Sequence, residues 1–325
     1  VTKDFARKAS GLIDDHNDFK GVLAGVGALG SAIADLWAKE YWGEWTFIDP
    51  DYIKTHNIIR HIAKDLHVGV FKADVVKQMV EMNYYPYYHI ANAIHDSITN
   101  IGNSKVIESI TAAALLVDAT TTLDSPRNLS QMDQIPRSVS VFLTPSGRSA
   151  VLLLEDAERS MRLDDLEAQY YRAIINSDWG KDHLEGHHGQ LWVGAGCRDV
   201  SAVISNESIQ LHAATLARQI RLLTVKPESF IRVWSANSET GVIALEELTV
   251  YNSLCFKRGD WEVIMDIDLQ ERLGKMRMYH LPNETGGVIV GYIDQKLKHI
   301  YVVDILNAPA DSEADRTGFT RGVSG

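Results

Sequence analysis

The chain of 325 residues is poor in cysteine, with only Cys197 and Cys255. No C-x-x-C pair is present, which excludes a four-cysteine zinc site. Two thiols far apart in the sequence also argue against a disulfide framework and are typical of a reducing compartment. We therefore expect a cytoplasmic protein.

The sequence also lacks long apolar runs, and it has fewer basic than acidic residues. No run approaches the roughly 20 apolar residues that a membrane-spanning helix needs, and no signal peptide is visible. The formal net charge of −11 disfavours nucleic acid as a partner, because phosphates repel an acidic surface. Hydrophobic residues make up 45% of the chain and charged residues 23%, as in a globular protein, and the length favours two domains. Because the sequence opens on Val1 instead of Met, we expect a piece of a longer protein.

The most informative stretch, residues 20–72, contains a glycine motif between two apolar runs. The first run leads into a G-x-G-x-x-G turn formed by Gly25, Gly27 and Gly30, a helical pattern follows, and the second run ends on Asp49. This order of strand, turn, helix, strand and acid is typical of a βαβ nucleotide-binding unit. We expect Gly25 to permit the turn, Gly27 to admit a phosphate and Gly30 to allow close helix packing, while Asp49 accepts the ribose hydroxyls. The alternative is a packing turn that binds no ligand.

Polar residues after Asp49 indicate which nucleotide is bound. An enzyme that cleaves ATP between its α and β phosphates needs cations on the departing charge, whereas a dehydrogenase needs none here. The sequence resembles the ThiF-type and ubiquitin-activating adenylating superfamily. The resemblance is carried by the glycine motif, a following D-x-D, then Asn57 and Arg60 as N-x-x-R, and then Lys72. The resemblance implies a Rossmann-like α/β domain with a mostly parallel sheet that uses ATP and Mg²⁺. It also implies that Asn57 orients ATP, Arg60 neutralises the triphosphate, and Lys72 holds the β and γ phosphates.

Two further site residues follow from the same resemblance. Asp118 ends an apolar run at a strand's carboxyl end, beside the glycine turn, and is the expected magnesium ligand, with Asp124 as the alternative. Many superfamily members carry an aspartate three residues after this position, where Thr121 stands here. Arg7, in the segment before the first strand, is a candidate for reaching the nucleotide site of a dimer partner. The alternative for Arg7 is an ordinary solvated helix residue.

The two cysteines receive different predictions. Cys197 follows a glycine-rich turn, precedes a predicted helix start and neighbours Arg198, two influences that lower a thiol pKa. The resemblance implies that Cys197 accepts the acyl group as a thioester; the alternative is a buried structural cysteine. Cys255 lies in an apolar run, for which we predict core packing.

The last stretch has a signature of its own. Residues 281–292, with Glu284 in E-T-G-G, resemble the opening of a JAB (JAMM, MPN) metalloprotease domain, in which this Glu is the general base for a zinc-bound water. The only histidine after Glu284 is His299, so the zinc ligands of that family are missing and this chain alone cannot be a working JAB peptidase. We expect a truncated JAB domain, with Zn²⁺ bound only if the rest is present. The predicted domains are residues 1–262, for adenylation, and residues 263–325, a partial α+β JAB-like domain.

The resemblance thus predicts ATP-dependent adenylation of the C-terminus of a ubiquitin-like protein and its transfer to Cys197, in a bacterial conjugation system with a possible antiphage role. The expected partners are that ubiquitin-like protein, a conjugating enzyme or fused conjugating domain, and a second copy of the chain in a homodimer. Two alternatives stay open at this point. One is an inert scaffold that binds a ubiquitin-like protein, and the other is an NAD-dependent oxidoreductase.

Overall fold

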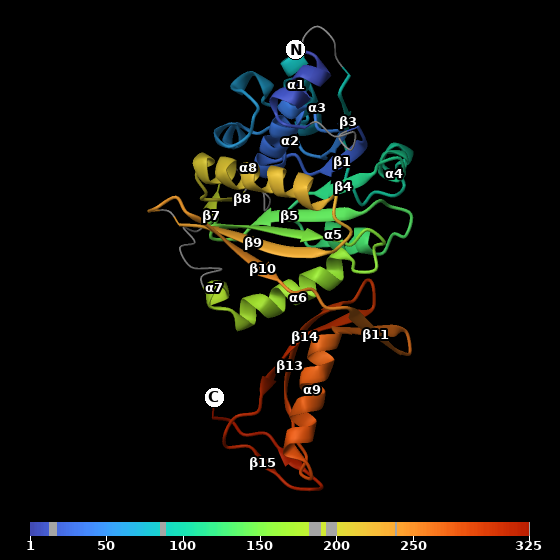
Figure 1. Cartoon of the computed structure of the whole chain (residues 1–325), viewed down its shortest axis with the longest axis vertical. Helices are drawn as coiled ribbons and strands as arrows, with labels where there is room; N and C mark the ends of the chain where they lie inside the picture. The colour runs from blue at the N-terminus through green and yellow to red at the C-terminus, as the bar shows by residue number, and fades with distance from the viewer. Residues whose placement is uncertain (13–17, 85–88, 182–189, 193–199, 238, 325) are drawn as a thin grey trace. The chain divides into compact units, whose positions relative to one another are not determined.

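The computed structural model describes the whole chain except residues 13–17, 85–88, 182–189, 193–199, 238 and 325. The chain forms two compact units, each built from two segments (Figure 1). The first unit comprises residues 1–163 and 181–247, and the second comprises residues 164–180 and 248–325.

An eight-stranded sheet forms the centre of the first unit, in the order β10-β9-β6-β5-β4-β1-β2-β3. The run from β3 through β5 is parallel, and β6 pairs antiparallel with both β5 and β9. The prediction of an α/β domain with a large, mostly parallel sheet is therefore confirmed. The strands are β1 Lys20–Ala24, β2 Glu44–Ile48, β3 Ala91–Ile94, β4 Leu115–Asp118, β5 Ser138–Leu143, β6 Ser149–Leu154, β9 Phe230–Ala236 and β10 Ile243–Leu248.

Helices bury both faces of this sheet, which explains why β1 and β4 are continuous apolar runs instead of alternating ones. On one face, α2 and α8 pack against each other, and the buried indole N–H of Trp37 donates to the carbonyl of Ala217 at 3.1 Å. On the other face, α4 and α5 cover Val22 and Leu116. The helices are α1 Lys3–Ala9, α2 Ala28–Glu40, α3 Lys72–Glu81, α4 Ser104–Thr111, α5 Asp124–Ser130 and α8 Asn206–Leu223. The 3-10 turns are η2 Thr55–Ile59, η3 Asp65–His67 and η4 Met82–Tyr84. Two short strands, β7 Gln190–Trp192 and β8 Val200–Ala202, pair antiparallel.

The second unit has a four-stranded sheet in the order β11-β12-β14-β13. Polar contacts tie α6 to this unit: Arg172 pairs with Asp266 at 2.6 Å, and the Tyr301 hydroxyl donates to the carboxylate of Asp164. The elements are α6 Leu163–Asn176, α7 Asp178–Lys181, β11 Ser253–Arg258, β12 Trp261–Asp266, α9 Ile267–His280, β13 Gly287–Asp294, β14 His299–Asn307, β15 Glu313–Ala314 and β16 Phe319–Thr320.

The compact units and the two predicted domains divide the chain at different places. The second segment of the second unit starts at Leu248, whereas the predicted JAB-like domain starts at residue 263. In the second unit, Glu284 is exposed, and among the described residues no three His, Cys, Asp or Glu side chains gather as metal ligands would. The JAB assignment gains no support here and stays a prediction. No helix in the described part of the chain is long and apolar enough to cross a membrane.

Candidate nucleotide site

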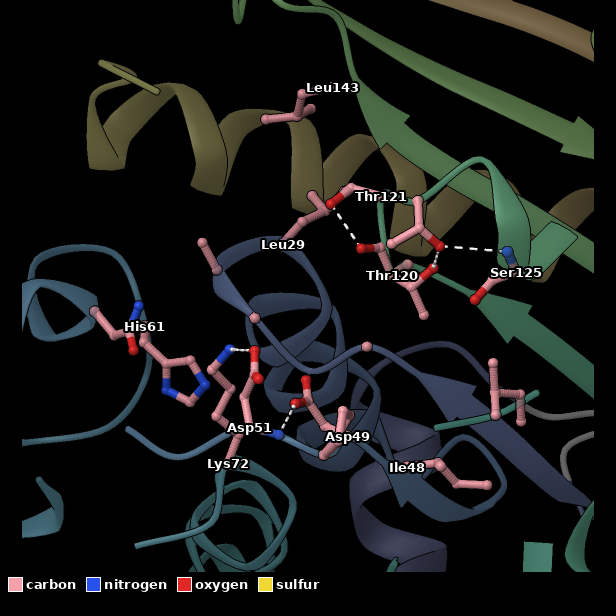
Figure 2. Close-up of a pocket in the computed structure, with 18 of the residues that line it drawn as sticks. Leu29, Ile48, Asp49, Asp51, His61, Lys72, Thr120, Thr121, Ser125 and Leu143 are labelled. Carbon is pink, nitrogen blue, oxygen red and sulfur yellow. Dashed lines mark hydrogen bonds and ion pairs between the residues drawn. The ribbon is translucent and has the colours of Figure 1, made fainter. Parts of the chain in front are cut away.

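A cavity of about 880 Å³ opens at the carboxyl ends of the parallel strands of the first unit (Figure 2). Ligand sites of open α/β sheets occur at this edge, because the loops that follow the strands converge there. The glycine turn after β1, Asp49 after β2 and the threonines after β4 all contribute to the lining.

An added Cβ would meet different surroundings at each of the three motif glycines. Gly25 has a φ of +79°, and a Cβ there would lie 2.6 Å from the backbone of Thr120. A Cβ at Gly30 would lie 2.0 Å from the carbonyl oxygen of Gly25, so α2 can approach the turn only without one. By contrast, no heavy atom of the described chain lies within 4 Å of a Cβ built at Gly27, apart from its chain neighbours. Protein packing thus explains Gly25 and Gly30, whereas Gly27 borders open space.

The start of α2 is suited to an anion. Its N-cap is Gly27, which has no side chain to cap the first turn. The N–H groups of this turn have no intrahelical acceptors, and the helix dipole places partial positive charge at the same point. A phosphate group beside Gly27 would satisfy both.

Asp49 holds the turn by its carboxylate. One oxygen accepts the N–H of Val26 and the other the N–H of Asp51, both at 2.9 Å. Only 4% of the residue is exposed, and this burial raises the pKa of Asp49, while the charge of Lys72 and these hydrogen bonds act in the opposite direction. Asp49 also lines the cavity, and each of its carboxylate oxygens has a second acceptor site.

Asn57, Arg60 and Lys72 all line this one cavity. They come from η2, the residue that follows it, and the first turn of α3. The ammonium of Lys72 pairs with Asp51 at 2.8 Å (Figure 2), and Arg60 donates to the carbonyl of Ile204 at 3.3 Å. Burial lowers the pKa of Arg60, but a guanidinium stays charged at neutral pH. The predicted phosphate-binding cations are therefore in one place.

The two candidate magnesium ligands lie in different surroundings. Asp118 is 2% exposed, does not line the cavity, and accepts the N–H of Thr120 at 2.9 Å. Burial raises the pKa of Asp118 to about 6. Asp124, at the start of α5, is exposed and lines the cavity. Thr121 also lines it, with a φ of +57°.

Three other predictions have different outcomes. Cys197 lies outside the described residues. Arg7 does not line the cavity: it donates to the Tyr41 carbonyl at 2.9 Å and pairs with Asp18 at 2.7 Å, which lowers the pKa of Asp18 to about 2. The prediction that Cys255 packs in a core is wrong, because it is exposed on the edge strand β11, where its thiol donates to Glu262 at 3.3 Å.

Sequence reasoning missed His61, which also lines the cavity. Its Nε2 contacts the carbonyl oxygen of Val26 at 2.7 Å, and its Nδ1 accepts the N–H of Ala63 at 3.0 Å. Its position directly after Arg60 was the only available signal, because a contact across 35 residues leaves no periodic pattern.

Comparison with known families agrees with this geometry. Residues 8–211, well over half of the chain, match the model of the ThiF family. The chain belongs to the ThiF family. No curated protein matches this ThiF-family chain.

Several solved structures are similar to this ThiF-family chain. A structure of MccB from E. coli with ATP is 17% identical, with a TM-score of 0.43, and the match covers 72% of this chain and 64% of that one. A structure of MccB from E. coli with succinimide is 16% identical, with a TM-score of 0.47 and coverages of 71% and 64%. A structure of PaaA is 16% identical, with a TM-score of 0.48 and coverages of 70% and 63%. The chain thus covers less than two thirds of the length of each of these proteins.

Proposed function

We propose that this ThiF-family chain uses ATP to adenylate the C-terminal carboxylate of a polypeptide, and on the sequence resemblance we propose a ubiquitin-like protein as that polypeptide. The observation that carries the proposal is the convergence of Asn57, Arg60 and Lys72 on the cavity where Gly27 borders open space. An oxidoreductase that binds NAD would share the glycine turn and Asp49 but would leave these three residues without a role. The structure thus favours ATP over a dinucleotide.

The chemistry follows from the charges. A carboxylate oxygen of the substrate attacks the α-phosphorus, the bond to the oxygen that bridges the α and β phosphates breaks, and pyrophosphate leaves with the electron pair. Negative charge develops on this leaving group, so Arg60 and Lys72 stabilise the transition state. The Asp51 carboxylate holds the Lys72 ammonium at the cavity before ATP arrives. When ATP binds, the Lys72 ammonium then contacts the phosphates, either in place of the Asp51 carboxylate or together with it.

Magnesium fits the site by way of one carboxylate. Mg²⁺ is typically held by substrate phosphates, waters and one or two protein carboxylates. Asp124 satisfies this requirement, because its carboxylate is exposed at the cavity. Asp51 is also exposed there but pairs with Lys72, and Asp118 is buried outside the cavity. We therefore propose Asp124 as the ligand in place of Asp118. When bound, the ion would neutralise part of the phosphate charge.

The later steps are proposals that rest on the sequence resemblance alone. They are transfer of the acyl group to Cys197 as a thioester, a homodimer, a conjugating enzyme or fused conjugating domain as partner, a bacterial antiphage setting and fusion to a JAB-type peptidase domain. One feature favours an inert scaffold as the second candidate function: Thr121 stands where many superfamily members carry a carboxylate. An exchange measurement separates the scaffold from the enzyme.

The test is ATP–pyrophosphate exchange with a ubiquitin-like protein as the substrate. Arg60→Ala and Lys72→Ala should each lower exchange by about 10²- to 10³-fold, as for the loss of other groups that stabilise transition-state charge. The matched controls are Arg218→Ala, exposed on α8, and Lys77→Ala, on the same helix as Lys72, because neither residue lines the cavity. Both controls should keep wild-type exchange.

Four results would contradict parts of the scheme. Exchange that survives both cavity substitutions would refute the roles of Arg60 and Lys72. Absence of exchange with retained ATP binding would favour the scaffold, and binding of NAD(H) without ATP would favour the oxidoreductase. Cys197→Ala should leave exchange intact and abolish a thiol-sensitive adduct on a non-reducing gel; an adduct that persists would exclude Cys197 as the acyl acceptor.

A further inference from the structure

His61 is a buried histidine that contacts a residue far away in the sequence, Val26. It is 8% exposed and lies two residues after η2. Its Nδ1 accepts the N–H of Ala63, so in the neutral ring the proton is on Nε2, which donates to the carbonyl oxygen of Val26 at 2.7 Å. Burial lowers the pKa of His61 to about 4, so the ring is neutral at physiological pH. The donor to Val26 is therefore always present there.

Val26 is the residue between Gly25 and Gly27 in the glycine turn, and both of its backbone polar groups are held by distant side chains. Its N–H donates to Asp49, and its carbonyl oxygen accepts from His61. The carbonyl belongs to the Val26–Gly27 peptide, whose orientation is therefore set by His61, whereas the N–H belongs to the preceding Gly25–Val26 peptide, which Asp49 holds. Neither residue belongs to the turn itself.

The orientation of this peptide decides what the cavity presents to an anion. In a trans peptide the carbonyl of one residue and the N–H of the next point in opposite directions. With the Val26 carbonyl directed at His61, the Gly27 N–H points away from His61, and it has no backbone acceptor among the described residues. A flip of this peptide would exchange an N–H donor for a carbonyl oxygen beside the start of α2. That oxygen would repel a phosphate.

We propose that His61 is a positioning residue that holds the Val26–Gly27 peptide with its N–H available to the nucleotide's phosphates. The proposal rests on the proposed use of ATP at this cavity. It adds a specific requirement: the side chain at position 61 must donate a hydrogen bond from the position of Nε2. A role in folding alone would place no such requirement on phosphate binding.

His67 provides a matched control in the same segment. It is 5% exposed, and its Nδ1 accepts the N–H of Lys64 at 2.8 Å, as that of His61 accepts from Ala63. However, His67 does not line the cavity. Substitutions at His67 therefore remove a comparable local contact without touching the glycine turn.

The experiment measures dissociation constants by calorimetry for ATP, tripolyphosphate and adenosine, using the full chain. Glutamine can place an amide N–H₂ near the position of Nε2, whereas asparagine reaches only as far as Nδ1. His61→Leu and His61→Asn should weaken ATP and tripolyphosphate binding about 10- to 100-fold, the range for losing a hydrogen bond to a charged group. Adenosine affinity should stay within about twofold, because the adenosine moiety makes no use of this hydrogen bond. His61→Gln should restore phosphate binding, and His67→Leu should leave all three affinities unchanged.

Equal losses for adenosine and tripolyphosphate, failure of a folded His61→Gln to restore binding, or the same losses in His67→Leu would overturn the proposal. If His61→Leu does not fold, the comparison of the glutamine and asparagine variants decides. These affinity measurements test the role of His61 separately from the proposed adenylation. The predicted affinity pattern without pyrophosphate exchange would refute adenylation alone, and exchange with unchanged affinities in the His61 variants would refute the role of His61 alone. A wild-type chain that binds neither ATP nor tripolyphosphate would refute both.

Discussion

Replacing Asp118 by asparagine should stabilise the protein at neutral pH. The Asp118 carboxyl ends β4 with 2% of the residue exposed, and one of its oxygens accepts the N–H of Thr120. Burial disfavours the charged form and raises its pKa to about 6 from 3.8. Asparagine has nearly the same shape, can accept the same hydrogen bond through its Oδ1 and carries no charge. The substitution therefore removes the charge and keeps the Thr120 contact.

The sign and size follow from linkage. A group whose pKa is raised by folding contributes stability that is fully present below the unfolded pKa of 3.8 and is lost as pH rises through about 6. The difference between these two values corresponds to about 3 kcal/mol. Burying the extra amide N–H₂ offsets part of this gain, so we expect Asp118→Asn to raise the free energy of unfolding by about 1–3 kcal/mol at pH 8. The gain should diminish below pH 6 and disappear near pH 4.

Urea unfolding at a series of pH values, with Asp124→Asn as the control, measures this directly. The control carboxylate is exposed, so its removal should leave stability nearly unchanged at every pH and weaken binding of magnesium–ATP. Two results would refute the reasoning. One is a folded Asp118→Asn protein that loses magnesium-dependent ATP binding, which would make Asp118 the metal ligand after all. The other is a loss of stability at pH 8, which would show that the charged carboxylate is required by the fold.

Two other predictions follow from the packing of the first unit. Gly30→Ala should lower the free energy of unfolding by about 1–3 kcal/mol in urea, because its Cβ meets the backbone oxygen of Gly25, whereas Gly27→Ala should leave stability unchanged and weaken ATP binding measured by calorimetry. The reverse pattern would contradict the assignment of open space at Gly27. Arg137→Met should cost about 2–4 kcal/mol of unfolding free energy, because Arg137 donates to four backbone carbonyls, at Glu155, Thr224, Lys226 and Glu228. A loss below about 0.5 kcal/mol in the same measurement would show that water replaces these contacts.

Local patterns predicted the elements of the glycine turn well. Glycine spacing, a short apolar run and the helical period each act within a few residues, so the order from β1 to Asp49 could be inferred from the sequence. Asn57, Arg60 and Lys72 were found by resemblance to the motifs of the adenylating superfamily, and the structure brings them to one cavity. Their roles in catalysis stay predictions.

Long-range contacts could not be predicted in this way. His61 reaches Val26, and Arg137 reaches the chain after α8, but neither contact leaves a trace in the residues next to it. The exposure of Cys255 was missed for a related reason. Its apolar neighbours suggested a core, whereas β11 is an edge strand and Cys255 sits on its exposed side.

The boundary between the units shows the same difficulty at a larger scale. The ThiF match spans α6, yet two residues of this helix have partners much later in the chain. Asp164 accepts a hydrogen bond from Tyr301, 137 residues away in the sequence, and Arg172 pairs with Asp266. A single cut at residue 262 would also split the paired register of β11 and β12, which runs from Ser253 opposite Asp266. Sequence comparison assigns α6 to the family domain, and contacts assign most of it to the second unit. The second unit is therefore built from residues 164–180 and 248–325, and any single cut between these two segments would separate them.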